Sequence, residues 1–417
     1  MKNVLLIFLV CLPAWLKADH LLVPMDNAQA NHLKAYGIAY WVLEHEVDVE
    51  WLLNYRGGSF LFRHTQKFEN EMRIRGVSFE RITDGRTNEI LAYITSETVN
   101  MDAVKLEVPP KVAVYSPRTK RPWDDAVTLA LTFAEIPYEV VYDPEVLEGK
   151  LSEYDWLHLH HEDFTGQYGK FIPRRTNASW FREEVQSQEG TARMFGYKKV
   201  SQLKLAVAKT IKDFVANGGF LFAMCSATDT YDIALAAEGV DIVDEVFDHD
   251  PMDPAADSKL DFSRTFAFHN FRLVKDAYTY EYSNIDANVR RRVSPNIDYF
   301  TLFEFSAKWD PVPTMLCQNH TRTVKGFLGQ TTAFKKDKIK PGITIMGELK
   351  AFDEARYIHG NLGRGMWTFY GGHDPEDYRH TLNEDPTDLS LHPNSPGYRL
   401  ILNNILFPAA RKKKRKT

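Results

Sequence analysis

Cys225 stands where a nucleophile could be presented to a substrate. Residues 220–224 are a short apolar run, which predicts a buried parallel strand that stops at this cysteine. A helix is expected soon after it, over about residues 230–237. A strand, a sharp turn and a helix, with the nucleophile at the turn, form the elbow that lifts a reactive side chain clear of a sheet. The alternative is a structural cysteine, because free cysteine is among the most buried residue types.

A cysteine nucleophile needs a base, and His373 is the candidate. Residues 363–370 predict another buried strand, which runs through two glycines into this histidine. The imidazole would draw the thiol proton and lower the pKa of Cys225, and Asp374 or Glu376 could orient the ring. The alternative is a loop histidine that only accepts a backbone hydrogen bond. Cys225 and His373 together favour a catalytic site.

A second cluster of chemically active side chains follows the apolar residues near position 157. Side chains alternate along a strand, so His158 and His160 share one face. With His161, Glu162 and Asp163 next to them, these histidines offer ligands of the kind that zinc takes. No HExxH spacing supports a metal, so we predict neither a metal nor another cofactor, and a zinc site stays an open alternative.

The elements that must position these residues resemble the class I glutamine amidotransferase-like superfamily, in its ThuA-like branch. The likeness covers residues 111–370 and lies in the order of strands at 112–116, 139–142, 155–160, 220–224 and 365–370. It implies an α/β fold, a flavodoxin-like doubly wound and mostly parallel sheet, with Cys225 and His373 at its carboxyl edge. The motifs depart from the family. Residues 223–227 lack both elbow glycines, and an extra residue separates His373 from Glu376.

The resemblance also places the end of the strand at 155–160 beside the nucleophile turn. It therefore implies that His160, His161, Glu162 and Ser226 line the substrate pocket. The implied activity is an amidotransferase-like hydrolysis of an amide-type bond, with backbone N–H groups after Cys225 holding the oxyanion. The alternative is a module that kept the fold and binds a sugar or peptide without catalysis. In either case the expected partner is a small molecule or a peptide.

Nearly the whole chain is also similar to secreted bacterial proteins often labelled asparagine synthetase B. The likeness lies in residues 22–26, 31–37 and 51–60. Those synthetases expose a catalytic cysteine directly after the initiator methionine, whereas position 2 here is Lys2, and they carry an SGGxDS-type loop that this chain lacks. A glutamine-hydrolysing asparagine synthetase is therefore kept only as an alternative.

The composition of successive segments indicates the targeting signal and the domain boundaries. Residues 1–18 predict a signal peptide cleaved near Ala18, which implies export to the periplasm or beyond. We expect a small amino-terminal α+β region at 19–107 and an α/β domain at 111–408, with insertions at about 162–196 and 239–341. The insertions are expected to contribute strands at 299–305 and 313–317. The basic residues at 409–417 predict a disordered tail that could touch an anionic membrane.

The remaining composition limits the partners and the redox chemistry. The chain has 417 residues and a formal net charge of −5, and no basic face interleaved with aromatic residues, so we expect no nucleic-acid partner. Cys225 and Cys317 are the cysteines outside the predicted signal peptide. An exported protein could join them in a disulfide, which would remove the nucleophile.

Overall fold

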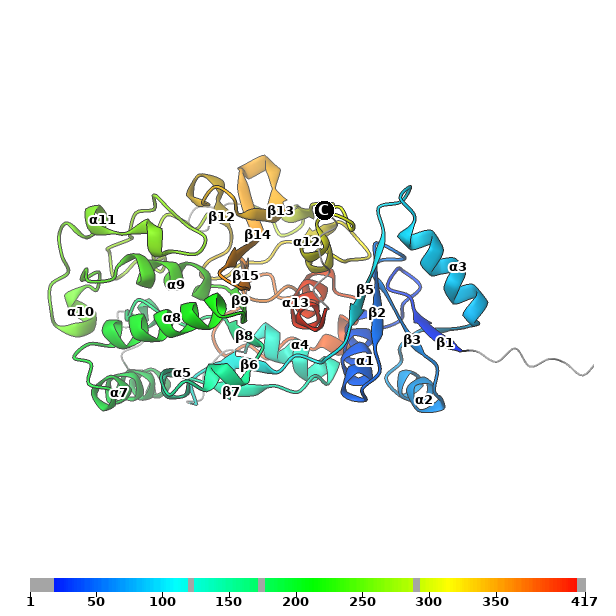
Figure 1. Cartoon of the computed structure of the whole chain (residues 1–417). Helices are drawn as coiled ribbons and strands as arrows, with labels where there is room; N and C mark the ends of the chain where they lie inside the picture. The colour runs from blue at the N-terminus through cyan, green and yellow to red at the C-terminus, as the bar shows by residue number, and fades with distance from the viewer. Residues whose placement is uncertain (1–18, 119–123, 172–176, 288–292, 411–417) are drawn as a thin grey trace, which may run out of the picture.

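The computed structural model describes residues 19–118, 124–171, 177–287 and 293–410, which fold around two sheets (Figure 1). Sheet A is antiparallel, and its strands run in the order β4 (Glu80–Ile82), β1 (His20–Val23), β3 (Ser59–Arg63), β2 (Val49–Leu53) and β5 (Asp102–Leu106). Three helices accompany it: α1 (His32–Glu44), α2 (Gln66–Ile74) and α3 (Asp84–Thr95). The amino-terminal region is therefore a mixture of helices and antiparallel strands.

Sheet B is mixed, and its parallel half contains all five strands predicted from the sequence. These are β7 (Glu139–Val141), β6 (Val112–Tyr115), β8 (Trp156–Leu159), β9 (Phe220–Met224) and β15 (Gly365–Tyr370), adjacent in that order. The pairing of β9 with β15 is in register, with Phe220 opposite Met366 and Met224 opposite Tyr370. The carboxyl ends of β8, β9 and β15 therefore meet at one edge of the sheet.

Antiparallel strands extend sheet B beyond β15. They are β14 (Glu354–Leu362), β13 (Thr344–Leu349), β10 (Tyr299–Leu302) and β11 (Thr323–Lys325), with β12 (Phe334–Lys335) paired to β14. Residues 299–302 confirm the first predicted added strand. The second was wrong, because α12 (Pro311–Leu316) occupies that position. Proline in the first turn suits a helix, since its missing N–H would have no partner there.

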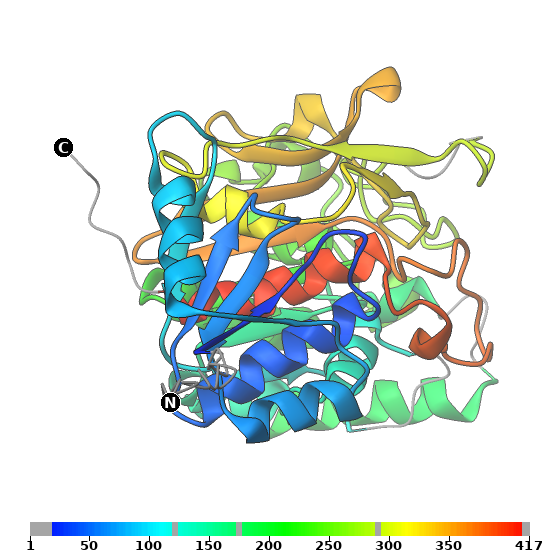
Figure 2. The same cartoon turned by 90° about the vertical axis from the view of Figure 1, so that its right-hand side faces the viewer.

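Alternate side chains of the parallel strands pack into two separate hydrophobic cores, one on each face of the sheet. Val112 and Val114 of β6 join one cluster, while Ala113 and Tyr115 join the other. Helices α4 (Ala126–Ala134), α13 (Pro396–Leu406) and α1 supply the first cluster. Helices α8 (Val200–Ala216) and α9 (Ala227–Ala236) supply the second. Sheet B is thus covered on both faces, and Figure 2 shows α13 and α1 crossing one of them.

Four shorter or more peripheral helices also contribute buried residues to the second core cluster. They are α5 (Asp143–Leu147), α7 (Ser179–Met194), α10 (Glu245–Asp248) and α11 (Ala256–Lys259). Within the described part of the chain no helix is both long and apolar enough to span a membrane. The predicted signal peptide at 1–18 and residues 411–417 of the predicted tail lie outside the described residues.

A buried arginine joins the amino-terminal region to sheet B and its helices. Arg399 of α13 is fully buried and donates hydrogen bonds to the carbonyl oxygens of Met25 and Gly57, at 2.9 and 2.8 Å. Its guanidinium also lies 3.1 Å from Nδ1 of His320. Because a buried charge is tolerated only with such partners, this residue fixes how the two regions meet.

A buried lysine fixes α8 against the edge of the parallel strands. Nζ of Lys204 lies 2.9 Å from the Asp143 carboxylate, and both side chains are almost completely buried. It also donates to the hydroxyl groups of Tyr115 and Tyr142, at 3.0 and 3.1 Å. The lysine therefore connects α8, β6 and the start of α5.

Replacing Lys204 by methionine should lower the free energy of unfolding by about 3–5 kcal/mol, because the Asp143 carboxylate would stay buried without its cation. Urea titration followed by circular dichroism measures this loss. The matched control is Lys209→Met on the same helix, whose pair with Glu238 is solvent-exposed and should be worth about 0–1 kcal/mol. Equal losses for the two variants would contradict the assignment.

Candidate functional site

Cys225 adopts a strained backbone conformation at the end of β9. Its φ is +48°, in the left-handed region that residues other than glycine rarely occupy. The turn is held on both sides: its N–H donates to the Gly372 carbonyl oxygen at 3.2 Å, and its own carbonyl oxygen accepts from the Thr228 hydroxyl at 2.7 Å. Helix α9 begins at Ala227, three residues earlier than predicted. Strain of this kind concentrates at functional sites, so the missing elbow glycines do not remove the elbow.

A cavity of about 280 Å³ opens beside this cysteine. Its walls come from the ends of three adjacent parallel strands and from segments near residues 171, 280, 328–330 and 379–382. The lining residues are His161, Phe171, Cys225, Tyr280, Leu328, Gly329, Gln330, His373, Arg379, His380, Thr381 and Leu382. The structure thus brings Cys225, His373 and His161 to one pocket. Apolar walls with a few convergent polar groups are typical of small-molecule sites.

The thiol itself is buried and protonated at rest. Burial raises the pKa of Cys225 to about 11, although backbone N–H groups of Gln330, Thr331 and Ser226 partly offset this effect. The Gln330 N–H lies 3.3 Å from Sγ. Among the described residues no hydrogen bond joins Sγ to the His373 ring. The direction of the pKa shift is opposite to that expected for a thiolate paired with an imidazole.

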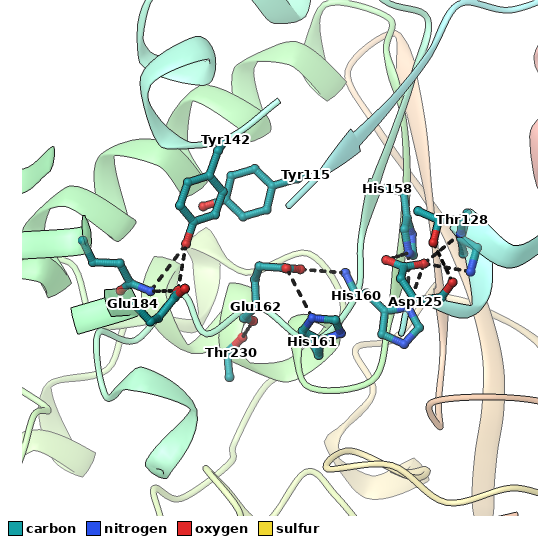
Figure 3. Close-up of polar contacts among 12 residues, drawn as sticks. Tyr115, Asp125, Thr128, Tyr142, His158, His160, His161, Glu162, Glu184 and Thr230 are labelled. Carbon is teal, nitrogen blue, oxygen red and sulfur yellow. Dashed lines mark hydrogen bonds and ion pairs between the residues drawn. The ribbon is translucent and has the colours of Figure 1, made fainter. Parts of the chain in front are cut away.

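Two histidines of the β8 strand and its end share one carboxylate (Figure 3). Nε2 of His158 lies 3.2 Å from Nδ1 of His160, and both side chains are fully buried. Asp125, just before α4, lies 3.3 Å from His158 Nε2 and 3.6 Å from His160 Nδ1. The Asp125 carboxylate thus lies beside both rings, a role that the sequence analysis does not assign to it.

His161 and Glu162 continue this cluster toward the pocket (Figure 3). Glu162 is buried, and its carboxylate accepts the His160 backbone N–H at 3.1 Å while lying 3.8 Å from His161 Nε2. Its own carbonyl oxygen accepts from the Thr230 hydroxyl at 3.1 Å. Of the predicted substrate-binding residues, His161 therefore lines the pocket, whereas His160 and Glu162 are not among its lining residues.

His373 joins this cluster from the end of β15. Its ring centroid lies 4.6 Å from that of His160 and 5.9 Å from that of His161. The His380 ring stacks on the His373 ring almost in parallel, with the ring centroids 4.5 Å apart. Burial lowers the pKa of His373 well below its usual range and that of His160 to about 4, with neighbouring imidazoles adding to the effect. Both rings are therefore neutral near pH 7.

The acids predicted to orient His373 are engaged elsewhere. Asp374 is buried and accepts the Glu376 backbone N–H at 2.8 Å, which closes its own turn. The Glu376 carboxylate lies 3.3 Å from Nδ1 of His392. No hydrogen bond or ion pair between either acid and the His373 ring is found in residues 293–410, where all three lie.

The structure also bears on two other expectations, that Ser226 lines the pocket and that Cys317 could form a disulfide with Cys225. Ser226 is fully buried at the start of α9, where its carbonyl oxygen accepts the Thr230 N–H at 3.1 Å, and it is not among the pocket-lining residues. Cys317 and Cys225 are both free thiols, so no disulfide consumes the candidate nucleophile.

Three further pocket or cluster residues had no assignment from the sequence. His380 lies 3.0 Å from each of two acids, Asp124 at Nε2 and Asp377 at Nδ1. The signal that could have found it is its position a few residues beyond His373 on the same loop. Gln330 and Asp125 reach the site from a long insertion and from a helix start, and no local pattern indicates either.

Comparison with known proteins leaves the family open. No protein-family model matches the chain, and no curated protein does. Two cytoplasmic proteins of Salmonella typhimurium are similar in structure at 11% and 12% identity, each with a TM-score of 0.35. The match covers 72% of this chain and 100% and 99% of theirs. A GH42 β-galactosidase matches 64% of this chain and 28% of its own at 13% identity, with a TM-score of 0.27.

The raised pKa of Cys225 predicts how fast the thiol is alkylated at each pH. With a pKa of about 11, the rate with iodoacetamide should rise roughly a hundredfold from pH 8 to pH 10, against about fourfold for an ordinary thiol of pKa ~8.5. Mass spectrometry of the peptide that contains Cys225 gives the rate, and circular dichroism at each pH checks that the fold persists. A rate that levels off below pH 9 would contradict the prediction.

Proposed function

We propose that this chain is a hydrolase-type enzyme that acts on an amide-type bond of a small molecule or peptide, with Cys225 as its nucleophile. One observation carries the proposal: the Cys225 sulfur lines a cavity at a strained turn between β9 and α9, with backbone N–H groups directed at it. Nucleophiles of α/β hydrolases occupy a turn of this kind.

The order of the parallel strands supports the fold that the proposal requires. Numbered along the chain, β6, β7, β8, β9 and β15 lie in the spatial order 2-1-3-4-5, which is the flavodoxin-like order. We therefore propose a flavodoxin-like doubly wound core, extended by antiparallel strands. In such sheets ligands bind at the carboxyl ends of the strands, where the Cys225 cavity lies. The resemblance to the ThuA-like branch of the amidotransferases agrees with this placement.

Because the resting thiol is protonated, its proton must leave during the attack. In the proposed reaction Sγ forms a bond to the carbonyl carbon while its proton passes to the His373 imidazole, whose Nδ1 is buried without a hydrogen bond in the described structure. The carbonyl oxygen gains the negative charge, which the N–H groups of Ser226 and Gln330 would stabilise. The amine leaves with the proton from His373, and water then releases the acid from the thioester.

The pocket also favours a kind of substrate. Phe171, Tyr280, Leu328 and Leu382 give apolar walls, whereas exposed Arg379 brings a guanidinium to the cavity. A guanidinium pairs with a carboxylate in two parallel hydrogen bonds. We therefore expect the substrate to carry a carboxylate as well as the scissile amide.

A second function, ligand binding without catalysis, is favoured by the raised pKa of Cys225 and by the contacts of Asp374 and Glu376. On this alternative the pocket holds a small ligand and the thiol is a buried part of its wall. The two functions differ in whether Cys225 can become acylated.

Acyl transfer from p-nitrophenyl acetate tests the proposal. We expect an acetyl group on the peptide that contains Cys225, released more slowly than it forms, because an activated ester traps the thioester stage. The variant Cys225→Ala should lose both the adduct and the initial burst of nitrophenol, whereas Cys317→Ser should keep them. If folded protein gives no adduct on Cys225, or if Cys225→Ala retains the burst, the binding function should replace the enzymatic one.

A further inference from the structure

Three imidazoles converge at the inner end of the Cys225 cavity. His160 and His161 follow β8, His373 follows β15, and each offers a ring nitrogen within 4.8 Å of the other two. His160 and His373 are buried, and His161 and His373 line the cavity. We propose that His160, His161 and His373 bind a divalent transition metal, with zinc as the best fit. The inference goes beyond the proposed function and does not need Cys225 to be a nucleophile.

An uncompensated polar atom supports this site. Nδ1 of His373 is buried and has no hydrogen-bond partner among the described residues. A buried polar atom left in this state costs about 1–3 kcal/mol, so natural proteins rarely keep one without a purpose. A metal bound at this nitrogen would supply the missing partner.

Carboxylates lie beside the second ring nitrogens of two of these histidines. Asp125 and His158 occupy the Nδ1 side of His160, at 3.6 and 3.2 Å, which leaves Nε2 for a metal. The Glu162 carboxylate lies 3.8 Å from Nε2 of His161. Metal-binding histidines usually direct their second nitrogen at a carboxylate in this way, which fixes the ring and its tautomer.

The chemistry of the ligand set points to zinc. Imidazole suits zinc, copper, iron and nickel, whereas calcium and magnesium prefer oxygen. Three histidines with an open fourth position form the ligand set of catalytic zinc sites. Because two of the three line the cavity, the open position would face a ligand in it.

His380 and Cys225 lie near this site without belonging to it. The His380 ring stacks on His373, and both nitrogens of His380 face acids. His380 therefore packs against a ligand ring and is not itself a ligand. Cys225 lines the same cavity, and its Sγ accepts from Gln330. A His373 lone pair that binds a metal cannot also accept a proton. His373 would therefore be a ligand in metal-bound protein and could be a proton acceptor only in metal-free protein. Metal binding is therefore measured directly and not through activity.

Zinc titration by calorimetry, on protein stripped with a chelator, tests the site. We expect one Zn²⁺ per chain, and a Co²⁺ derivative with the intense visible absorption of tetrahedral coordination. His161→Ala and His373→Ala should each abolish binding or weaken it more than a hundredfold. Asp125→Asn, which keeps the size of the side chain, should weaken it about 10–100-fold. His269→Ala, outside the cluster, is the matched control and should bind as the parent does.

Two outcomes with the parent protein and the histidine variants would overturn the assignment. One is the absence of stoichiometric zinc binding to folded protein. The other is binding that survives both His161→Ala and His373→Ala, since His161 is only partly buried and its variant is expected to fold. Cys225→Ala should bind zinc as tightly as the parent, and a loss there would replace the three-imidazole ligand set. This variant also separates the two proposals, because it removes acylation of the thiol while leaving the metal site.

Discussion

The parallel pairing of β8, β9 and β15 is the constraint on which the site depends. Because the three strands run side by side in one direction, their carboxyl ends deliver residues that lie up to 213 positions apart to one edge. His160 and His161 come from the first strand, Cys225 from the second and His373 from the third. Two cores, one on each face of the sheet, hold this edge rigid.

Burial sets the chemistry of the groups gathered there. It raises the pKa of Cys225 and lowers those of His160 and His373, so thiol and imidazoles are all neutral near pH 7. A neutral thiol is a weak nucleophile, which explains why the proposed attack needs a proton acceptor in the step itself. Neutral imidazoles, in contrast, are ready to bind a metal. Desolvation therefore weakens Cys225 as a nucleophile and favours metal binding by the histidines.

Two of the parallel strands, β9 and β15, could be predicted because each is a short apolar run. The other three were expected from the order of strands in the resembled family, and the structure has strands at those positions. The positions of Cys225 and His373 followed from β9 and β15. The strand expected at 313–317 failed because a short apolar run does not distinguish strand from helix, and proline at its start decided for the helix.

Several features of the site could not be predicted from the sequence because they depend on contacts between residues far apart in the chain. Asp125 reaches His160 from a helix start 35 positions away, and Gln330 reaches Cys225 from an insertion. The partners of Asp374 and Glu376 depended on the shape of their own turn, which residue types alone do not fix. The pKa of Cys225 could not be anticipated either, because it depends on burial by a loop with no local signature.

At one edge of sheet B, Cys225 lines a pocket with His161 and His373, and the His160 ring lies next to these two imidazoles. X-ray diffraction from crystals grown with zinc, at wavelengths above and below the zinc absorption edge, tests this arrangement most directly. We expect an anomalous peak bounded by His160, His161 and His373, with the Cys225 sulfur in the wall of the same cavity. A structure in which these imidazoles point away from one another, with no peak between them, would contradict it.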